Sequence, residues 1–415
     1  MRFAHIADCH IGAWRDPKLK DINAEAFEKA IDLAVQKKVD FIILAGDLFN
    51  TSLPGIDGLK IAVIKLKQLR DLEIKVYAIA GSHDYSPSGK TMIDVLDQAG
   101  LLVNVVKGDI VDDKLKLKFT VDKKTGVKIT GIFGRKGMLD RKHYEELVRE
   151  NLEKEKGFKI FIFHTALSEF KPKELEKMDA SPLSLLPKGF NYYAGGHVHI
   201  VGNFNSAGYD NVVFPGPTFP NNFRELEVLQ NGGFYIYEGN VDSDGFVKNG
   251  KTEYVPVIVK NVFSLEINCN GKDVDKVIEE LDAKIKREEF LDTIVTIRLV
   301  GKLVKGKPSD FNFNEIFKKF YNKGAYYVMK STYNLRSAEF EEVKIDTASV
   351  DDAEDKIMRE HLGQVKVSGW DKETELKMIK ALMAILETEK HEGEKVVDFE
   401  KRVVKEVNET LKLGL

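Results

Sequence analysis

The sequence predicts an α/β fold followed by a small α+β unit and a C-terminal helical segment. Strand-like and helix-like patterns alternate over residues 1–240 and again over residues 255–335, whereas residues 341–415 show helical periodicity. With 415 residues, the chain is long enough for two or three domains. We therefore expect three parts, of which only the first carries clusters of residues suited to chemistry.

The first part alternates strands with amphipathic helices. Region 23–38 places Phe27, Ala30 and Ile31 on one helical face, and region 39–45 is a nearly continuous apolar run, as expected for a strand covered on both faces. The elements expected in order are strand 2–7, helix 23–38, strand 39–45, helix 58–70, strand 74–80, helix 90–99, strands 101–106, 116–119 and 129–133, a highly charged helix 139–156, strand 159–163 and a strand that ends at Gly195.

The second part shows a β-α-β-α-β pattern. Its expected elements are strand 263–267, helix 273–287, strand 293–300, helix 311–322 and strand 325–331. Helix 273–287 places Val277, Leu281 and Ile285 on one face. No cluster of ligand-type residues falls inside this part, so we expect a non-catalytic role.

The C-terminal part is expected to form helices at 353–362, 374–390 and 396–413. The second of these carries an apolar stripe that includes Leu376, Ile379 and Leu386, and the third repeats the pattern. Two such helices cannot bury their stripes alone, so they need either each other or a partner.

Composition predicts a soluble globular protein. Hydrophobic residues make up 43% and charged residues 31% of the chain, and no apolar run reaches the length of about eighteen residues that predicts a membrane span. We see no signal peptide. The two cysteines, Cys9 and Cys269, favour a reducing, cytoplasmic location over a disulfide framework.

The net charge of −3 means that any binding of nucleic acid must use local basic patches. The basic positions expected near the site loops are Arg15, Lys18, Lys20, Arg135, Lys136, Arg141, Lys142 and Arg224. Such side chains could contact phosphates, although surface lysines are usually only solvated.

Ligand-type side chains follow five predicted strands at their C-terminal ends. The motifs are Asp8-Cys9-His10, Gly46-Asp47, Gly81-Ser82-His83-Asp84, His164 and Gly195-Gly196-His197-Val198-His199. Five of the nine histidines of the chain lie in these motifs. Ligands bind in the crevice outside the carboxyl ends of the strands in an open α/β sheet. We therefore expect one shared site.

His197 and His199 are separated by one residue, so on an extended backbone both project from the same face toward a common point. The paired glycines before them would let the backbone turn. Taken alone, this stretch also fits an arrangement in which one histidine binds a metal ion and the other is an ordinary residue whose hydrogen bonds are made with other groups. Imidazole together with carboxylate suits a first-row divalent ion such as manganese, iron or zinc, and the number of ligands indicates two ions.

The ordered motifs resemble the signature of the calcineurin-like metallophosphoesterases over roughly the first 240 residues. The segments Phe3-Ala4-His5-Ile6-Ala7-Asp8, Ala45-Gly46-Asp47-Leu48-Phe49 and Phe214-Pro215-Gly216-Pro217 are similar to its Mre/SbcD-type branch, the nuclease subunit of the DNA double-strand-break repair complex. The resemblance implies a two-sheet metallophosphoesterase sandwich flanked by helices. It also implies that residues 255–335 cap the nuclease domain of residues 1–240 and help to grip DNA.

The resemblance also implies roles for the motif residues. Asp8, His10 and His199 would hold one metal ion, His164 and His197 would hold the other, and Asp47 would bridge them. Ser82 stands where the family has an asparagine ligand, so we expect the second ion to bind more weakly.

For catalysis, the resemblance implies that His83 contacts the phosphate or protonates the leaving oxygen, and that Asp84 orients its imidazole. The alternatives for His83 are an additional metal ligand or an ordinary loop histidine.

The function that the resemblance implies is a manganese-dependent DNA nuclease with 3′-to-5′ exonuclease and single-strand endonuclease activity. It would act as a homodimer, held by the apolar helices at 58–70 and 90–99, and with an SMC-like coiled-coil ATPase bound by residues 341–415. The alternatives are an enzyme acting on a small phosphoester or cyclic nucleotide, and a scaffold with a degraded metal site. The residues beyond 240 favour the nuclease, and the other intact ligand positions disfavour the scaffold.

Overall fold

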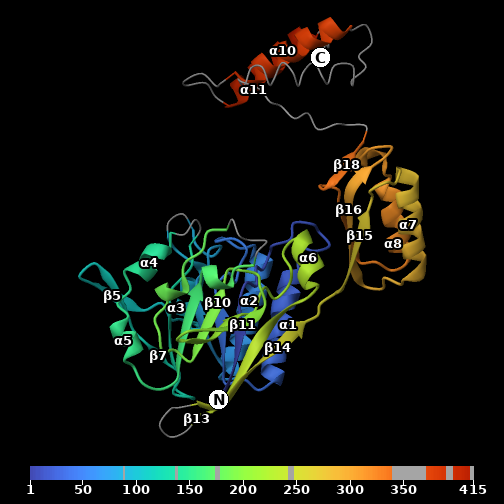
Figure 1. Ribbon diagram of the computed structural model, residues 1–415. Coiled ribbons are helices and arrows are strands. Elements are labelled where there is room, and N and C mark those ends of the chain that lie inside the picture. Colours follow the sequence, from blue (N-terminus) through green and yellow to red (C-terminus); the bar gives the residue numbers. More distant parts are fainter. Residues whose placement is uncertain are drawn as a thin grey trace. The chain divides into compact units, whose positions relative to one another are not determined.

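The computed structural model of the protein describes residues 1–86, 89–135, 139–172, 178–241, 247–338, 371–388 and 396–411 (Figure 1). The chain divides into two compact units, Met1–Ser337 and Ala338–Leu415. Lys136 and the helix expected at 353–362 lie outside the described residues. None of the described helices combines the length and the hydropathy needed to cross a membrane.

The first sheet has six strands in the order β14-β13-β1-β2-β3-β4. Its strands are β1 Arg2–Ile6, β2 Phe41–Ala45, β3 Lys75–Ile79, β4 Val103–Asn104, β13 Gly232–Val241 and β14 Val247–Val257. The strands from β1 to β4 are parallel, whereas β13 is antiparallel to both β1 and β14. The carboxyl ends of β1, β2 and β3 therefore meet at one edge.

The second sheet also has six strands, in the order β11-β12-β10-β9-β8-β7. Its strands are β7 Thr120–Val121, β8 Lys128–Gly131, β9 Lys159–His164, β10 Tyr192–Gly196, β11 Gly202–Ser206 and β12 Tyr209–Phe214. The central strands β8, β9, β10 and β12 are parallel. The ends of β9 and β10 thus also lie together.

The two sheets pack face to face. Phe3 and Phe41 of the first sheet stack with ring centres 5.0 Å apart, and Tyr192 of the second sheet meets Phe3 edge-on at 5.0 Å. The first sheet is covered on its outer face by α1 Ile22–Gln36, α2 Ile56–Asp71, α3 Met92–Gln98 and α6 Phe223–Leu229. Short helices cover the second sheet. The predicted two-sheet sandwich flanked by helices is confirmed.

The charged segment 139–156 forms two short helices, α4 Arg141–Glu145 and α5 Glu150–Glu153, and not the single helix that its sequence predicts. Between them the chain pairs with β6 Lys114–Leu117, which forms a hairpin with β5 Gly108–Val111. The backbone N–H of Leu115 donates to Glu146 O and that of Val148 donates to Leu115 O, both at 2.9 Å. Pairing with a strand distant in sequence overrides the local helical pattern.

Residues 261–337 form a four-stranded sheet with both helices on one face (Figure 1). Its elements are β15 Asn261–Asn268, α7 Val274–Arg287, β16 Thr293–Leu303, a short 3-10 turn at Pro308–Asp310, α8 Phe313–Asn322, β17 Tyr327–Ser331 and β18 Leu335–Ser337. Two further 3-10 turns, Ser168–Phe170 and Leu183–Leu185, lie between β9 and β10. β16 is parallel to β15, β17 and β18. The predicted β-α-β-α-β order is confirmed, and β18 is added to it.

The described part of the second unit consists of helices α10 Lys372–Leu386 and α11 Val396–Leu411, which pack against each other. The Asp371 side chain caps α10 by accepting from Thr374 N–H at 2.8 Å. The packing leaves apolar side chains uncovered, since Leu386, Val397 and Val404 are 70%, 58% and 59% exposed. The two helices therefore bury only part of their stripes on each other.

Candidate metal centre

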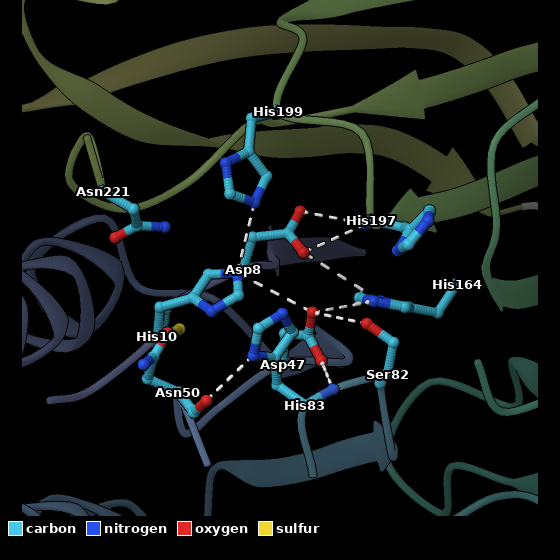
Figure 2. A network of polar contacts seen from close by, with 12 residues as sticks. Asp8, His10, Asp47, Asn50, Ser82, His83, His164, His197, His199 and Asn221 are labelled. Atoms are coloured by element: carbon cyan, nitrogen blue, oxygen red, sulfur yellow. Dashed lines mark hydrogen bonds and ion pairs between the residues drawn. The ribbon is translucent and has the colours of Figure 1, made fainter. Parts of the chain in front are cut away.

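The predicted ligand residues converge where the carboxyl ends of the two sheets meet (Figure 2). Asp8 and His10 follow β1, Asp47 follows β2, His164 ends β9, and His197 and His199 follow β10. Ligand-type side chains form three groups, and within each group the ligand atoms lie within 4.8 Å of one another. Two of them, Asp8/His10/His199 and Asp47/His164/His197, are the two ligand groups that the sequence resemblance implies for the two ions. The third, His10/Asp47/His83, combines a residue of each of these groups with His83.

Asp47 lies between the two groups. Its Oδ2 is 3.1 Å from His164 Nε2 and 3.7 Å from His10 Nε2, and its Oδ1 accepts a hydrogen bond of 2.7 Å from the backbone N–H of His83. The side chain is 2% exposed. A carboxylate in this position can serve two ions at once.

Four residues of the site have a left-handed backbone. The φ angles of Asp8, His10, Asp47 and His197 are 51°, 44°, 50° and 87°, a region that non-glycine residues rarely adopt and that clusters at functional sites. The Asp8 carboxylate accepts from His197 N–H at 3.0 and 3.2 Å. Because the chain turns at His197, the rings of His197 and His199 join different groups, and the common point expected from an extended backbone is not observed.

Gly195 and Gly196 lie inside β10, and not in a turn as the sequence suggests. A Cβ atom on Gly196 would lie 2.3 Å from the carbonyl oxygen of Ala45. On Gly46, whose φ is +87°, a Cβ atom would lie 2.3 Å from His164 Nδ1. These positions need glycine because strands of the two sheets approach each other closely at the centre.

Oxygen acceptors fix three imidazole rings of the centre. Nδ1 of His164 and Nδ1 of His83 each lie 2.8 Å from a main-chain carbonyl oxygen, and Nδ1 of His199 lies 2.9 Å from the Glu225 carboxylate. A ring held in this way cannot rotate freely, and in its neutral form, with the proton on Nδ1, it offers the Nε2 lone pair to a metal ion or substrate.

The donor set fits divalent metal ions. Nε2 of His10 and Nε2 of His199 are 3.1 Å apart, close to the separation of about 3 Å between neighbouring ligands whose bonds to one ion are about 2.1 Å long. Burial lowers the pKa of His10 to about 3 and that of His197 to about 4. Both rings are therefore neutral at pH 7, as metal ligands must be.

His164 differs in its protonation. Burial lowers its pKa, but the Asp47 carboxylate outweighs this effect and raises the pKa of His164 to about 10. An ion that binds at this ring must therefore displace a proton.

Ser82 lies beside the second group. Its Oγ is 3.4 Å from Asp47 Oδ2, and the residue is 5% exposed. The hydroxyl therefore donates to the shared carboxylate. A direct bond from Ser82 to a metal ion remains a prediction.

Asp84 does not contact the His83 ring, contrary to the expectation from the sequence. Its buried carboxylate accepts from Gly81 N–H at 2.8 Å and from Phe49 N–H at 3.2 Å, so that it joins the loops after β3 and β2. Burial raises the pKa of Asp84 to about 7. The acceptor that orients the His83 ring is the carbonyl oxygen of Asn50, a main-chain contact that side-chain patterns cannot reveal.

Glu225 is a residue of the centre that the sequence analysis missed. It lies in the first turn of α6, and its side chain is 19% exposed. The side chain of Asn222 accepts from Glu225 N–H at 3.0 Å and caps the helix. The spacing Asn-x-x-Glu after the Pro-Gly-Pro turn resembles a capping box and could have indicated this position.

Two other residues lie in or directly after the first strand. His5 is fully buried, with Nδ1 3.1 Å from the Tyr192 hydroxyl. Cys9 is buried in the core. Neither residue belongs to the two ligand groups.

A cavity of about 590 Å³ opens beside His83, with Asn50, Tyr85 and Arg135 in its lining. The Arg135 guanidinium lies 5.0 Å from the centre of the Tyr85 ring and 5.1 Å from that of the Phe133 ring. A cation fixed at the entrance to the centre suits a phosphate-bearing substrate.

Comparison with known proteins places the chain among phosphoesterases. Residues 1–201 match the calcineurin-like phosphoesterase family. The DNA double-strand break repair protein Mre11 of Methanocaldococcus jannaschii is 30% identical over 326 residues, which cover 73% of this chain and 82% of that protein. The protein of the same name from Sulfurisphaera tokodaii is 28% identical over 387 residues, which cover 90% of each. The one from Archaeoglobus fulgidus is 27% identical over 331 residues, which cover 75% and 69%.

Ser82→Asn is expected to strengthen manganese binding at the Asp47/His164/His197 group. The longer amide can bring a carbonyl oxygen to the ion, and we expect this direct ligand to change affinity by at least the roughly 10–100-fold that an outer partner of a ligand contributes. Isothermal titration with manganese measures both sites, and the affinity of the Asp8/His10/His199 group should not change. Ser82→Ala is the matched control and should not tighten binding. Equal affinities in wild type and Ser82→Asn would contradict the prediction.

Proposed function

The chain belongs to the Mre11/SbcD-type branch of the calcineurin-like phosphoesterases, and we propose on this basis that it is a DNA nuclease that processes double-strand breaks at a two-metal centre. Its family makes it a metal-dependent phosphodiesterase, as the sequence predicts. The observation that carries the proposal is Asp47, whose carboxylate lies between two groups of ligand-type side chains.

In the proposed mechanism, Asp8, His10 and His199 would hold one ion, His164 and His197 would hold the other, and Asp47 would help to hold both. Bound divalent ions would supply a water activated at neutral pH and would offset charge on the phosphate. The imidazole and carboxylate donors suit a first-row divalent ion, and we favour manganese because the family resemblance implies it.

His83 supplies the acid of the proposed mechanism. The Asn50 carbonyl oxygen holds its Nδ1 at 2.8 Å, and the residue lines the substrate cavity. In the protonated form, the ring can donate from Nε2 to the leaving oxygen of the cleaved phosphodiester.

A DNA substrate fits the chain better than a small phosphoester. The cavity of about 590 Å³ beside His83 is open and carries Arg135, so that it can admit a phosphodiester strand. The part formed by residues 261–337, which we propose to be a capping domain, gives the chain more surface than small-substrate chemistry needs. We propose exonuclease and endonuclease activities from the family resemblance, and a cytoplasmic location from the cysteine content.

His83→Ala is expected to reduce the rate of phosphodiester cleavage by about 10²-fold or more, while both ions stay bound. The reason is that His83 assists the phosphate and is absent from the two groups proposed to hold the ions. Manganese content and cleavage of end-labelled duplex DNA are measured on the same sample.

The matched control for this variant is His143→Ala. This histidine contacts the Phe133 ring, with ring centres 5.0 Å apart, and lies outside the ligand groups, so its replacement should change neither property. Loss of an ion from His83→Ala would show that His83 is a ligand, a role that its proximity to His10 and Asp47 also permits.

The helices α10 and α11 are proposed to bind a coiled-coil ATPase of the SMC type. Leu386, Val397 and Val404 remain exposed after the helices pack against each other. An apolar stripe of this kind can pack in a groove or against the helices of a partner.

Removal of residues 338–415 is expected to spare manganese-dependent cleavage and to abolish binding of the ATPase. All residues of the proposed centre lie in the unit Met1–Ser337. Co-purification with the ATPase and a nuclease assay on both chains provide the measurement. Retained co-purification after truncation would place the contact elsewhere.

We also propose a homodimer through α2 and α3. Ile64 on α2 and Val95 on α3 are 51% and 57% exposed, and a two-fold interface would bring two active sites to two DNA ends. Ile64→Asp should yield monomers in sedimentation analysis. Ile110→Asp, which changes a residue that is 67% exposed on β5, should leave the dimer intact. A wild-type monomer would contradict the proposal.

A further inference from the structure

Glu225 connects the proposed metal centre to helix α6. Its Oε1 accepts from His199 Nδ1 at 2.9 Å, and its Oε2 accepts from the backbone N–H of Asn221 at 2.8 Å. The carboxylate thus holds the His199 ring from one side and the segment before α6 from the other. A carboxylate behind a metal-binding histidine fixes the orientation of its ring and increases its basicity.

Helix α6 is held in turn by the part formed by residues 261–337. Arg298 on β16 donates to both carboxylate oxygens of Glu227 on α6, with distances of 2.6 to 3.0 Å. The two side chains are 19% and 17% exposed, and the guanidinium lies 5.1 Å from the centre of the Phe223 ring. A bidentate, partly buried arginine–carboxylate pair is rigid and directional, unlike an exposed surface pair.

A second connection reaches the loop that follows His10. Tyr327 on β17 donates its hydroxyl to Asp16 at 2.6 Å. The same loop is tied to the segment before α6, since Trp14 Nε1–H donates to the Pro220 carbonyl oxygen at 3.0 Å, and the Asn23 side chain of α1 donates to Asn221 at 2.7 Å. The loop after His10 and the segment before α6 are therefore connected to each other and to residues 261–337.

The second ligand group lacks such a connection. His164 is fixed by the Ala45 carbonyl oxygen and Asp47 by His83 N–H, both within the two-sheet sandwich. Within the described ranges, no side-chain hydrogen bond or ion pair joins Asp47, His164 or His197 to helix α6, whereas His199 is joined to it through Glu225. The two groups thus differ in what holds their ligands in place.

We propose that Arg298, acting through Glu227 and helix α6, positions Glu225 and His199, so that the capping part sets the geometry of the first metal group and not of the second. Arg298, Glu227 and Glu225 are positioning residues in this arrangement. The inference rests on the proposed two-metal function and adds a regulation to it. Any contact that displaces the capping part, such as DNA binding to it, would change the affinity for one ion only.

The test is isothermal titration of the full chain with manganese. Glu225→Gln should weaken one of the two ions by roughly 10–100-fold, the usual effect of losing an outer partner of a ligand. Arg298→Ala and Glu227→Gln should weaken the same ion by a smaller factor, about 3- to 10-fold, because they act through Glu225. The double variant Arg298→Ala/Glu227→Gln should lose no more manganese affinity than either of these single variants, since Arg298 and Glu227 act as one pair. The affected ion is identified as the one that His199→Ala loses.

Lys319→Ala is the matched control. It removes an ion pair of similar geometry between Lys319 and Asp282, at 2.6 and 2.8 Å, on the helices of the same part and away from α6. The control should leave both affinities unchanged, and its thermal unfolding should match that of Arg298→Ala. Unchanged affinities in Arg298→Ala and Glu227→Gln, or equal weakening of both ions, would overturn the inference while leaving the two-metal function intact. A wild-type chain that binds fewer than two ions would overturn the proposed function itself, and this inference with it.

Discussion

The centre depends on one buried carboxylate that side chains from both sheets must reach. Asp47 follows β2 of the first sheet, and its Oδ2 lies 3.1 Å from Nε2 of His164, the last residue of β9 in the second sheet. Because neither sheet contains a full set of ligands, the site forms only when the two carboxyl edges meet. The aromatic packing of Phe3 and Phe41 against Tyr192 holds the sheets in that relation. The aromatic core between the sheets therefore determines whether the ligands of the two sheets come together.

The close approach of the sheets explains the unusual backbone. Left-handed conformations at Asp8, Asp47 and His197 cost of the order of 1–3 kcal/mol each, and Gly46 and Gly196 leave no room for a Cβ atom. The surrounding hydrogen bonds hold these conformations, since the Asp8 and Asp47 carboxylates each accept from the backbone of a distant segment. The ligands are thereby positioned before any ion binds, which reduces the reorganisation needed on binding.

Much of this could be predicted from the sequence, because ligand residues that directly follow strands are local features. His164, Asp47 and the Asp8-Cys9-His10 motif needed only a correct strand end. The missed features depend on the tertiary structure. The role of Glu225 requires knowing that α6 lies against His199, the Asn50 contact is made by the main chain, and residues 146–148 leave the helical pattern to pair with β6. The glycines before His197 suggest a turn in the sequence, because close approach between the two sheets leaves no local signal.

The central claim is that two ions share Asp47. Anomalous diffraction from crystals of the protein grown with manganese tests it most directly. We expect two peaks, one in contact with Asp8, His10 and His199 and the other with His164 and His197, and both within bonding distance of the Asp47 carboxylate. A single peak at saturating manganese, or two peaks of which one does not contact Asp47, would contradict the two-metal centre.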